Sequence, residues 1–331
     1  MRRQTGRLVS TLAIAAGLAL AGCHKGGSAG QAAPSKLAQA SRPNGSQWVE
    51  LGTQSGPVPS GVRSEPAHLL RYKDQAILVD VGDGATEQLA KAGLLPADVH
   101  TIFISHLHFD HTGGLFGFLG MRFQGSRANT PVTIYGPPGT KALVAGLRSA
   151  MQNGAALAPL GPPTYEVIEL NDQSKVTVGD IKVTAAANTH YIAWPGAGPK
   201  PVALSYRFDM PDRAIAYTGD TGPSEKVEAL ARNADLLVSE IMDVDSAMSR
   251  LKLDQPDVPA PIRLYIRTHF QKEHLEADQV GLLAQRAGAK SLVLTHFGGA
   301  DGQQAQIDRL TKAIAANYKG PITFANDLDK F

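Results

Sequence analysis

The feature that most constrains this 331-residue chain is a dense cluster of metal-binding side chains directly after an apolar run. Residues 101–105 form the run, and the next six positions hold His106, His108, Asp110 and His111 before the chain reaches a pair of glycines. Two histidines one residue apart can hold the same ion from an extended turn, while the Asp-His pair can face a neighbouring ion. The pattern therefore predicts a metal site where a buried strand ends.

The single cysteine of the chain, Cys23, limits the ligands that such a site can use. One cysteine can form neither an intramolecular disulfide nor a thiolate cluster. Any metal that this protein holds must therefore be bound by His, Asp or Glu.

From Trp48 onward, short apolar runs alternate with helical patterns. Runs rich in Ile, Val, Leu and Ala, typical of strands buried on both faces, predict strands at 76–81, 101–105, 132–135, 181–186, 203–208, 214–218, 236–239 and 291–295. Helical patterns, with Pro223 near one start and Gly288 at one end, occur at 86–94, 141–151, 224–232, 275–287 and 304–318.

This alternation predicts a layered α/β architecture with helices on the outer faces of buried sheets. The length allows one large domain or two ordinary ones, and 43% hydrophobic residues suffice for a large core. No shift of composition divides residues 47–331, so a single domain is expected there. The chain has no repeat of fixed period and no coiled-coil heptads.

Four further polar residues share one position, just past the carboxyl end of an apolar run. Open α/β sheets build their sites at that end of the strands, so these residues are expected to join the cluster around His106. They are Asp80, His190, Asp220 and His296.

The run from His106 to His111 resembles the HxHxDH signature of the metallo-β-lactamase superfamily, and the later candidates follow in the order that this family requires. The similarity covers about residues 48–331 and implies a four-layer αββα sandwich. Asp80 matches a buried supporting aspartate of the family. The ligands implied for one metal ion are His106, His108 and His190. Those implied for a second ion are Asp110, His111 and His296, with Asp220 bridging the two.

The resemblance thus implies two divalent metal ions per chain, with zinc as the first expectation and manganese or iron as alternatives for imidazole and carboxylate ligands. Two ions about 3.5 to 4 Å apart can hold a hydroxide that is ionised near neutral pH and can polarise the substrate oxygen that it attacks. Asp110 can orient that hydroxide. The implied reaction is hydrolysis without a covalent intermediate.

Residues 236–240, and residues 273–276 ahead of the helix that leads to residues 292–296, resemble the ribonuclease Z and arylsulfatase-like branch of the superfamily. Carried over from that branch, Glu240 orients His274, and His274 protonates the leaving group, which leaves poorly as an alkoxide or phenoxide. His269 is the alternative general acid. The branch often has a histidine before the glutamate, whereas this chain has Ser239.

The first 22 residues have the anatomy of an export signal. Three arginines precede an apolar run at 8–21, which is shorter than the ~20 residues that a membrane span needs. The tetrapeptide ending at Cys23 resembles the bacterial lipobox, in which the cysteine is acylated and becomes the new N-terminus. An ordinary secretory signal is the alternative.

Residues 23–46 predict a flexible tether, because they contain almost nothing to bury, and residues 47–331 are the expected hydrolase domain. His24 follows the cysteine where an aspartate would favour the inner membrane, so we expect an exported protein on the periplasmic face of the outer membrane. No other stretch is apolar enough to cross a membrane, and contact with the membrane is expected only through the lipid anchor at Cys23.

The charge balance argues against a nucleic-acid partner. The chain has 32 Lys and Arg against 30 Asp and Glu, and loss of Arg2, Arg3 and Arg7 with the signal leaves a mature chain that is slightly acidic. A surface that binds nucleic acid needs clustered positive charge. We therefore expect no nucleic-acid partner, and expect a small-molecule ester as the substrate. The branch often forms dimers, so the resemblance allows a homodimer, although no helix indicates an interface.

Two long segments begin at site residues and are expected to wall or cover the cleft. The first, 191–201, contains Tyr191 and Trp194, which can stack on a ligand or pack in the core. The second, 242–268, is proline-rich and is expected to be a long loop.

These features together predict a binuclear hydrolase that cleaves a small ester, a phosphodiester or an aryl sulfate, outside the cytoplasm. The alternative enzyme is a lactonase or β-lactamase-type hydrolase on the same metal core. A different class is a non-catalytic lipoprotein that binds metal or another ligand, since a fold does not by itself imply a function.

Overall fold

The computed structural model describes residues 45–331, except 57, 126–130, 156–163, 192–199 and 300–301. The predicted signal at 1–22, the lipidation residue Cys23, most of the tether and Trp194 lie outside the described residues. The described residues group into one compact unit. None of the helices in the described part of the chain is long and apolar enough to cross a lipid bilayer.

The first sheet has six strands in the spatial order β1-β2-β3-β4-β5-β6. The first three pair antiparallel, and the remaining pairs are parallel. The strands are β1 (Gln47–Gly52), β2 (Ala67–Tyr72), β3 (Gln75–Val81), β4 (Thr101–Phe103), β5 (Val132–Gly136) and β6 (Tyr165–Glu169).

The second sheet has seven strands in the order β13-β12-β11-β10-β9-β8-β7. Its β10 to β13 half is parallel and its β7 to β10 half is antiparallel. The strands are β7 (Lys175–Val178), β8 (Ile181–Ala187), β9 (Leu204–Asp209), β10 (Ala214–Tyr217), β11 (Leu236–Met242), β12 (Leu292–Gly298) and β13 (Ile322–Phe324).

Three apolar clusters hold the layers together. One lies between the two sheets and joins, among others, Trp48 of β1 to Tyr206 of β9. The second packs the outer face of the first sheet against α1 (Ala85–Lys91), α3 (Leu115–Gly125) and α4 (Thr140–Ala155). The third packs the second sheet against α5 (Glu225–Leu230), α8 (Ala277–Ala287) and α9 (Gln304–Asn317).

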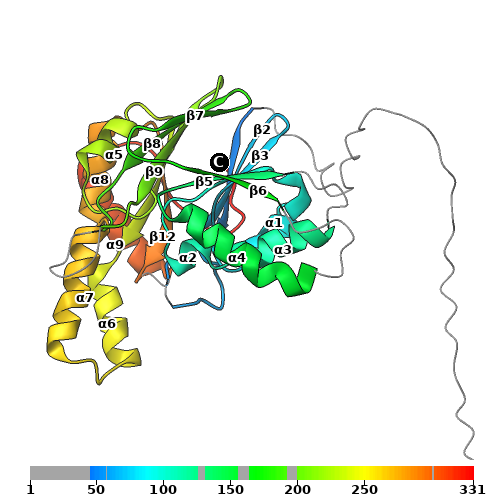
Figure 1. The fold of residues 1–331 in the computed structure, drawn as a ribbon. Coiled ribbons are helices and arrows are strands. Elements are labelled where there is room, and N and C mark those ends of the chain that lie inside the picture. The colour runs from blue at the N-terminus through cyan, green and yellow to red at the C-terminus, as the bar shows by residue number, and fades with distance from the viewer. Residues whose placement is uncertain (1–44, 57, 126–130, 156–163, 192–199, 300–301) are drawn as a thin grey trace, which may run out of the picture. The chain divides into compact units, whose positions relative to one another are not determined.

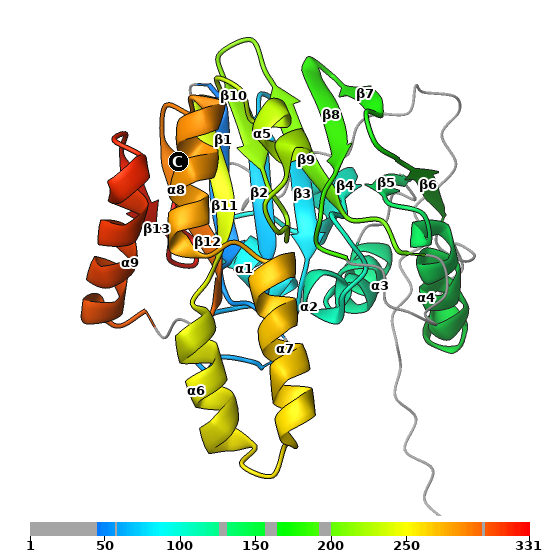
Figure 2. The same ribbon diagram turned by 90° about the vertical axis from the view of Figure 1, so that its left-hand side faces the viewer.

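The expected four-layer αββα sandwich is therefore confirmed, as Figures 1 and 2 show. All eight predicted strands and all five predicted helices are present, with ends that differ by at most four residues. Local chemistry explains the boundaries of two helices. The Ser224 side chain caps the first turn of α5 by accepting from the Val227 N–H, and Gly288 ends α8 in the left-handed conformation.

The prediction of a long loop after Met242 is wrong. The chain forms α6 (Val244–Asp254) and α7 (Ala260–Glu273), a helical hairpin that projects from the body (Figure 2). The three prolines that suggested a loop all lie in the turn or in the first turn of α7, where proline is tolerated. The second helix of the hairpin ends at Glu273, directly before His274.

Candidate metal centre

The turn after β4 brings the first cluster together. His108 is extended and precedes α2 (Phe109–Thr112), a single helical turn that carries Asp110 and His111. The side chains of His106 and His111 are fully buried, whereas Phe109 between them is 90% exposed. The same short segment therefore turns its polar side chains inward and leaves its aromatic side chain in solvent.

Asp80, at the end of β3, holds this turn in place through hydrogen bonds. Its carboxylate accepts from the Ser105 N–H and hydroxyl at 2.7 Å each, and from the Tyr217 hydroxyl at 2.8 Å. The same carboxylate lies 2.9 Å from Nδ1 of His111. Asp80 has a φ of 58°, a strained conformation for a residue other than glycine. The role expected for Asp80 agrees with these contacts.

Asp220, which follows β10, lies at the middle of the site. Its carboxylate oxygens are 3.2 Å from Nε2 of His296 and 3.3 Å from Nε2 of His111. They are also 3.8 Å from Nε2 of His106 and 3.9 Å from Nε2 of His190. Four imidazoles from three segments of the chain thus converge on one carboxylate.

The ligand atoms fall into two groups within which every atom lies no more than 4.8 Å from the others. The first group is His106, His108 and His190, and the second is Asp110, His111, Asp220 and His296. These are the two sets that the resemblance implies, and we call their seven members the metal centre. No predicted ligand lies elsewhere.

Unpartnered atoms test whether these residues suit a metal. Nε2 of His106, Nε2 of His111 and Oδ1 of Asp220 are buried, and none has a hydrogen-bond partner among the described residues. Buried polar atoms without partners are costly, and three of them directed at one place are what a cation would satisfy. The donor set therefore fits a metal.

The electrostatics of the site favour the same conclusion. Burial holds the pKa values of His106 and His190 well below their ordinary range, so both rings are neutral donors. Burial opposes ionisation of Asp220, but the charges of His296 and His111 outweigh it and hold the pKa of Asp220 well below its usual range. Neutral His106 and His190 and an ionised Asp220 are forms that bind a cation. For His111 and His296, Asp220 and Asp110 outweigh burial and raise the pKa, so a cation bound there would displace the protons of these two rings.

The predicted pair of Glu240 and His274 is present beside the metal centre. Oε2 of Glu240 lies 2.6 Å from Nδ1 of His274, and the other carboxylate oxygen accepts from the Thr221 N–H. Burial, followed by the charge of Asp220, raises the pKa of Glu240, and burial lowers that of His274. Nδ1 of His274 is occupied by this contact, which leaves Nε2 available. His274 also lies within ligand distance of His190 and Asp220.

His269, the alternative acid, lies further from the centre. Its Nδ1 pairs with Glu273 at 2.9 Å, and its ring centroid is 5.5 Å from that of His274. It belongs to neither ligand group. Tyr191 packs its ring 5.0 Å from His190 and 5.1 Å from His108, so it borders the centre.

The sequence analysis missed a second border of the site, the segment between β1 and β2. The Gly56 N–H donates to Oδ2 of Asp110 at 2.9 Å, and a Cβ at Gly56 would lie 2.5 Å from that of Asp110, so only glycine fits. Glu65 is buried nearby with Oε2 unpartnered among the described residues. Burial and then Asp110 raise the pKa of Glu65 to about 7. No apolar run marks this segment, so the sequence offered little signal for it.

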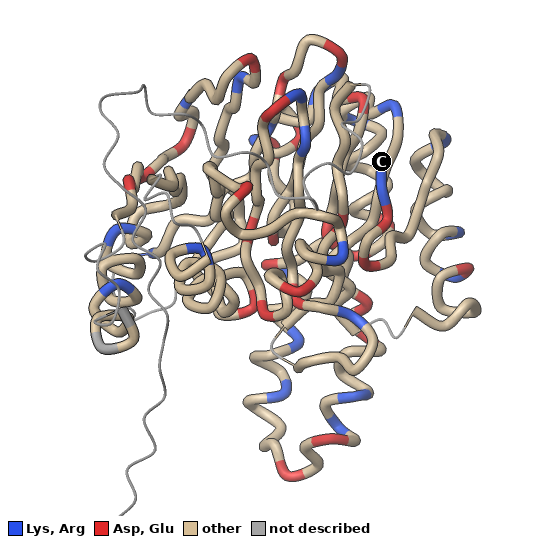
Figure 3. Tube along the Cα trace, turned by 90° about the vertical axis from the view of Figure 1, so that its right-hand side faces the viewer, with Lys and Arg blue, Asp and Glu red and all other residues tan. Residues whose placement is uncertain are grey.

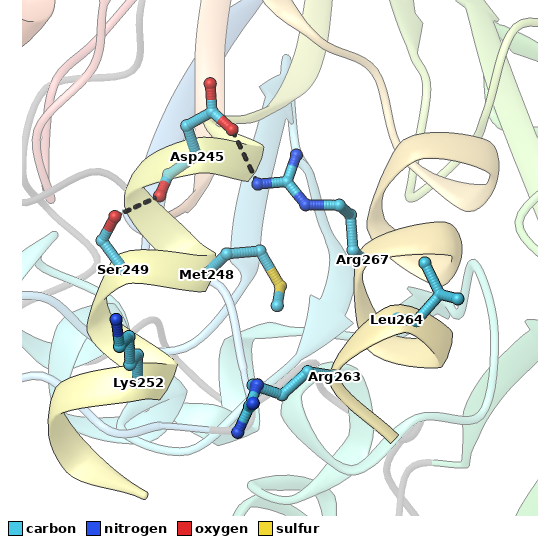
Figure 4. Close-up of a pocket in the computed structure, with 7 residues that line it drawn as sticks. All are labelled: Asp245, Met248, Ser249, Lys252, Arg263, Leu264 and Arg267. Carbon is cyan, nitrogen blue, oxygen red and sulfur yellow. Dashed lines mark hydrogen bonds and ion pairs between the residues drawn. The ribbon is translucent and has the colours of Figure 1, made fainter. Parts of the chain in front are cut away.

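A surface groove separates the two helices of the α6–α7 hairpin (Figure 4). Arg267 pairs with Asp245 at 2.9 Å. Lys252 and Arg263 also line the groove, and within the described part of the chain neither has an ion pair with an acidic side chain. Cationic residues occur along both helices, and acidic residues lie near the far end (Figure 3).

Comparison with known proteins assigns most of the chain to one family. Residues 75–297 match the family described as a beta-lactamase superfamily domain. Ribonuclease Z of Mycobacterium avium (strain 104) is 30% identical over 293 residues, which span 85% of this chain and 95% of that protein.

Solved structures resemble the fold at lower identity. The metallo-beta-lactamase fold protein YhfI from Bacillus subtilis has a TM-score of 0.65 at 20% identity, over 86% of this chain and 98% of its own. The short form of human tRNase Z has a TM-score of 0.61 at 24% identity, over the same 86% and 98%. Zinc-bound PqqB from Methylobacterium extorquens has a TM-score of 0.62 at 14% identity, over 86% and 99%.

The exclusion of a nucleic-acid partner is wrong. Relatives that match 85% of the chain are ribonucleases, so a near-neutral charge does not separate this protein from enzymes that act on RNA. The physical reason is that net charge is a sum over the whole chain. A phosphodiester is recognised by local groups, and this chain offers both the metal centre and the Lys252 and Arg263 side chains of the hairpin groove.

Proposed function

The chain belongs to the metallo-β-lactamase superfamily of metal-dependent hydrolases, and from that premise we propose that it is a binuclear phosphodiesterase. One observation carries the proposal: Asp220 lies where two ligand groups meet, with the Glu240–His274 pair beside it. The two groups suit two cations, and the acid pair suits an ester whose leaving oxygen needs a proton.

We propose zinc for both positions, because all seven ligands are imidazoles or carboxylates; manganese and iron suit the same ligands. His106, His108 and His190 would hold one ion, and Asp110, His111 and His296 the other, with Asp220 shared. Ions bound there supply a nucleophilic hydroxide at neutral pH and polarise the phosphoryl oxygen. The zinc carried by PqqB, which shares the fold, supports this choice.

Asp110 is the residue proposed to orient the attacking water. Burial opposes its ionisation, but His111 and His296 together outweigh burial and hold the pKa of Asp110 well below its usual range. The carboxylate is therefore an acceptor at neutral pH, and the Gly56 N–H fixes one of its oxygens. An acceptor held in this way can align the water for attack at phosphorus.

His274 is the proposed general acid, with Glu240 as its positioning residue. Glu240 fixes Nδ1, so that Nε2 is the nitrogen that can donate a proton to the leaving oxygen. The lowered pKa of His274 makes it a ready donor once it carries the proton. The leaving group departs as an alcohol, and the attacking water becomes the new phosphoryl oxygen.

Among esters, the proposal favours phosphodiesters, including those of RNA, because relatives that match 85% of the chain are ribonucleases. Aryl sulfates need the same proton donor and are the second ester to test. In a lactone the leaving alkoxide stays attached to the product. The activity of a lactonase should therefore depend less on proton donation by His274.

We propose that this reaction takes place outside the cytoplasm, with the protein anchored by an acylated Cys23 to the periplasmic face of the outer membrane. The support is the apolar run followed by the lipobox-like tetrapeptide in the sequence. Palmitate labelling of the wild-type chain and of Cys23→Ser tests it. Label on the wild type alone is expected, and an unlabelled wild type rejects the anchor.

The test of the function is metal analysis of the mature protein followed by a panel of esters. We expect about two metal ions per chain and cleavage of a chromogenic phosphodiester, both lost in His108→Ala. His100→Ala removes an exposed histidine away from the centre and should keep both. A metal-loaded protein that opens only lactones contradicts the phosphodiesterase, and one that cleaves nothing supports the non-catalytic binding class.

A further inference from the structure

His296 differs from the other buried imidazoles of the metal centre in how its ring is held. Nδ1 of His106 contacts the Ser105 hydroxyl at 3.1 Å, and Nδ1 of His111 contacts Asp80 at 2.9 Å. Nδ1 of His190 contacts the Glu273 carbonyl at 3.0 Å. Nδ1 of His296 has no hydrogen-bond partner among the described residues, and Oε2 of Glu240, which contacts His274, lies 4.0 Å from it. Since a second ring contact usually orients a metal-binding histidine, something else must position this one.

The backbone at His296 is unusual and offers the alternative. His296 has a φ of 49°, in the left-handed region that residues other than glycine rarely occupy. The register between β11 and β12 also shifts there: Glu240 pairs with Thr295, but the next residue, Ile241, pairs with Phe297. His296 is thus the extra residue of a β-bulge, a device that redirects a side chain. Such a conformation persists only where neighbouring contacts hold it.

The strand β1 of the opposite sheet, together with Thr53 directly after it, supplies those contacts on both sides of the bulge. Before it, the Thr295 hydroxyl donates to Oε2 of Glu50 at 2.9 Å. After it, the Phe297 N–H donates to the Thr53 carbonyl at 3.0 Å. All of Glu50, Thr53 and Thr295 are buried, so water does not compete for these bonds.

Glu50 is itself fixed in the core. Oε1 accepts from the Trp48 indole N–H at 2.7 Å, and Oε2 lies 2.7 Å from Nδ1 of His68. Within the described residues, no Lys or Arg pairs with it. A buried carboxylate is costly unless donors surround it, and here one of the three donors is the residue before His296. None of these side chains lies in either ligand group.

We propose that Glu50 is a positioning residue for the metal centre: through Thr295 it holds the bulged backbone of His296, and so replaces the ring contact that this imidazole lacks. The proposal rests on the proposed metal centre. It predicts that loss of the hydrogen bond between Glu50 and Thr295 lowers the affinity for the ion that His296 would hold. The affinity for the ion at His106 should stay unchanged.

The experiment compares Thr295→Val, which keeps the shape and removes the donor, with Thr295→Ser, which keeps the donor. Zinc affinities of both positions are measured by chelator competition. Thr295→Val should lower the zinc affinity of the position that includes His296 by about 10- to 100-fold and leave the affinity of the position at His106 unchanged. Thr295→Ser should resemble the wild type. Glu50→Gln combined with Thr295→Val should add nothing to the loss. Additive losses, or equal losses at both positions, would overturn the proposal.

Tyr318→Phe is the matched control for lost stability. It removes a buried hydroxyl that donates to the Ala289 carbonyl at 3.0 Å, outside the metal centre. Both ions should bind to it as to the wild type.

NMR of the imidazole rings in the metal-free protein gives a readout that needs no metal. The chemical shifts of the His296 ring should change in Thr295→Val but not in Tyr318→Phe. Unchanged His296 shifts in Thr295→Val would reject the proposal. A wild type that binds no metal would reject the proposed function, while this comparison would still decide the role of Glu50.

Discussion

The metal centre and the α6–α7 hairpin are joined through α7, yet they are built in opposite ways. Five of the seven residues of the centre are at most 2% exposed, and contacts from both sheets hold them. In the hairpin, none of residues 245–272 is buried, and Leu253 is 82% exposed. One region is part of the core, and the other lies almost entirely in solvent.

The difference indicates which properties each region can change. A buried polar network loses geometry and stability together when one member is replaced. A solvent-exposed hairpin can change sequence at little cost in folding. We infer that the centre fixes the reaction and that the hairpin is free to adjust which substrates are held near it.

The largest expected contrast is between two aspartates. Asp220→Ala removes the carboxylate on which four imidazoles converge and should lower kcat/KM for a phosphodiester by about a thousandfold or more, with loss of bound metal. Asp257→Ala, in the turn of the hairpin, should change neither. Activity assays and metal analysis of both variants measure the contrast. Full metal content in Asp220→Ala would contradict the proposed bridge.

Next in size is the contrast between His274 and His269. His274→Ala should lower kcat by about 10²- to 10³-fold for an alkyl leaving group and by less for p-nitrophenolate, which needs no proton. His269→Ala should have the smaller effect, since His274 lies within ligand distance of His190 and Asp220 and His269 does not. The dependence of kcat on leaving-group pKa measures this. A steeper dependence in His269→Ala would transfer the acid role to that residue, and metal loss in His274→Ala would make His274 a ligand.

A third contrast concerns stability. Leu294 of β12 is fully buried in the cluster that packs α8 and α9 on the second sheet, so Leu294→Ala should cost about 2 to 4 kcal/mol of unfolding free energy. Leu253→Ala in the hairpin should cost less than about 0.5 kcal/mol. Urea denaturation of both variants measures the difference. Equal losses would mean that the hairpin is packed against something in solution.

The same contrast explains how much the sequence could predict. Continuous apolar runs precede the site residues, so Asp80, Asp220 and His296 were predictable, although His296 lies at a bulge inside β12 and not beyond its end. The edge strands β6 and β7 are only half-buried and lack that pattern. The helices α6 and α7 bury almost no residue, so hydrophobic periodicity could not reveal them.

Contacts between residues far apart in the sequence were beyond prediction for another reason. Glu50 and Thr295 are separated by 245 positions, and nothing in β1 marks its one carboxylate as a partner of β12. Glu65 likewise becomes part of the site only when the segment after β1 folds over Asp110. Sequence order predicts ligands at strand ends, whereas the residues that orient them depend on the packing of two sheets.

A smaller effect should appear in the pH dependence of the metal-free protein. Burial and the charge of Asp110 raise the pKa of Glu65 from 4.5 to about 7. Because the folded state favours the protonated acid, its contribution is complete below pH 4.5 and is lost as the pH rises to about 7. This loss amounts to at most about 3 kcal/mol. Thermal melts should show it in the wild type and not in Glu65→Gln, and identical slopes would contradict it.

The smallest effect tests the hairpin as a substrate contact. Arg263 precedes His274 by eleven residues, about 16 Å along a helix, so only a chain of several phosphates can reach both. Lys252→Ala with Arg263→Ala should raise KM for an RNA oligonucleotide by about two- to fivefold and make it less salt-dependent. The KM of the double variant for a small phosphodiester should stay unchanged. The control Lys312→Ala, on α9, should leave the KM for the oligonucleotide unchanged. An oligonucleotide KM that ignores both substitutions would confine recognition to the metal centre.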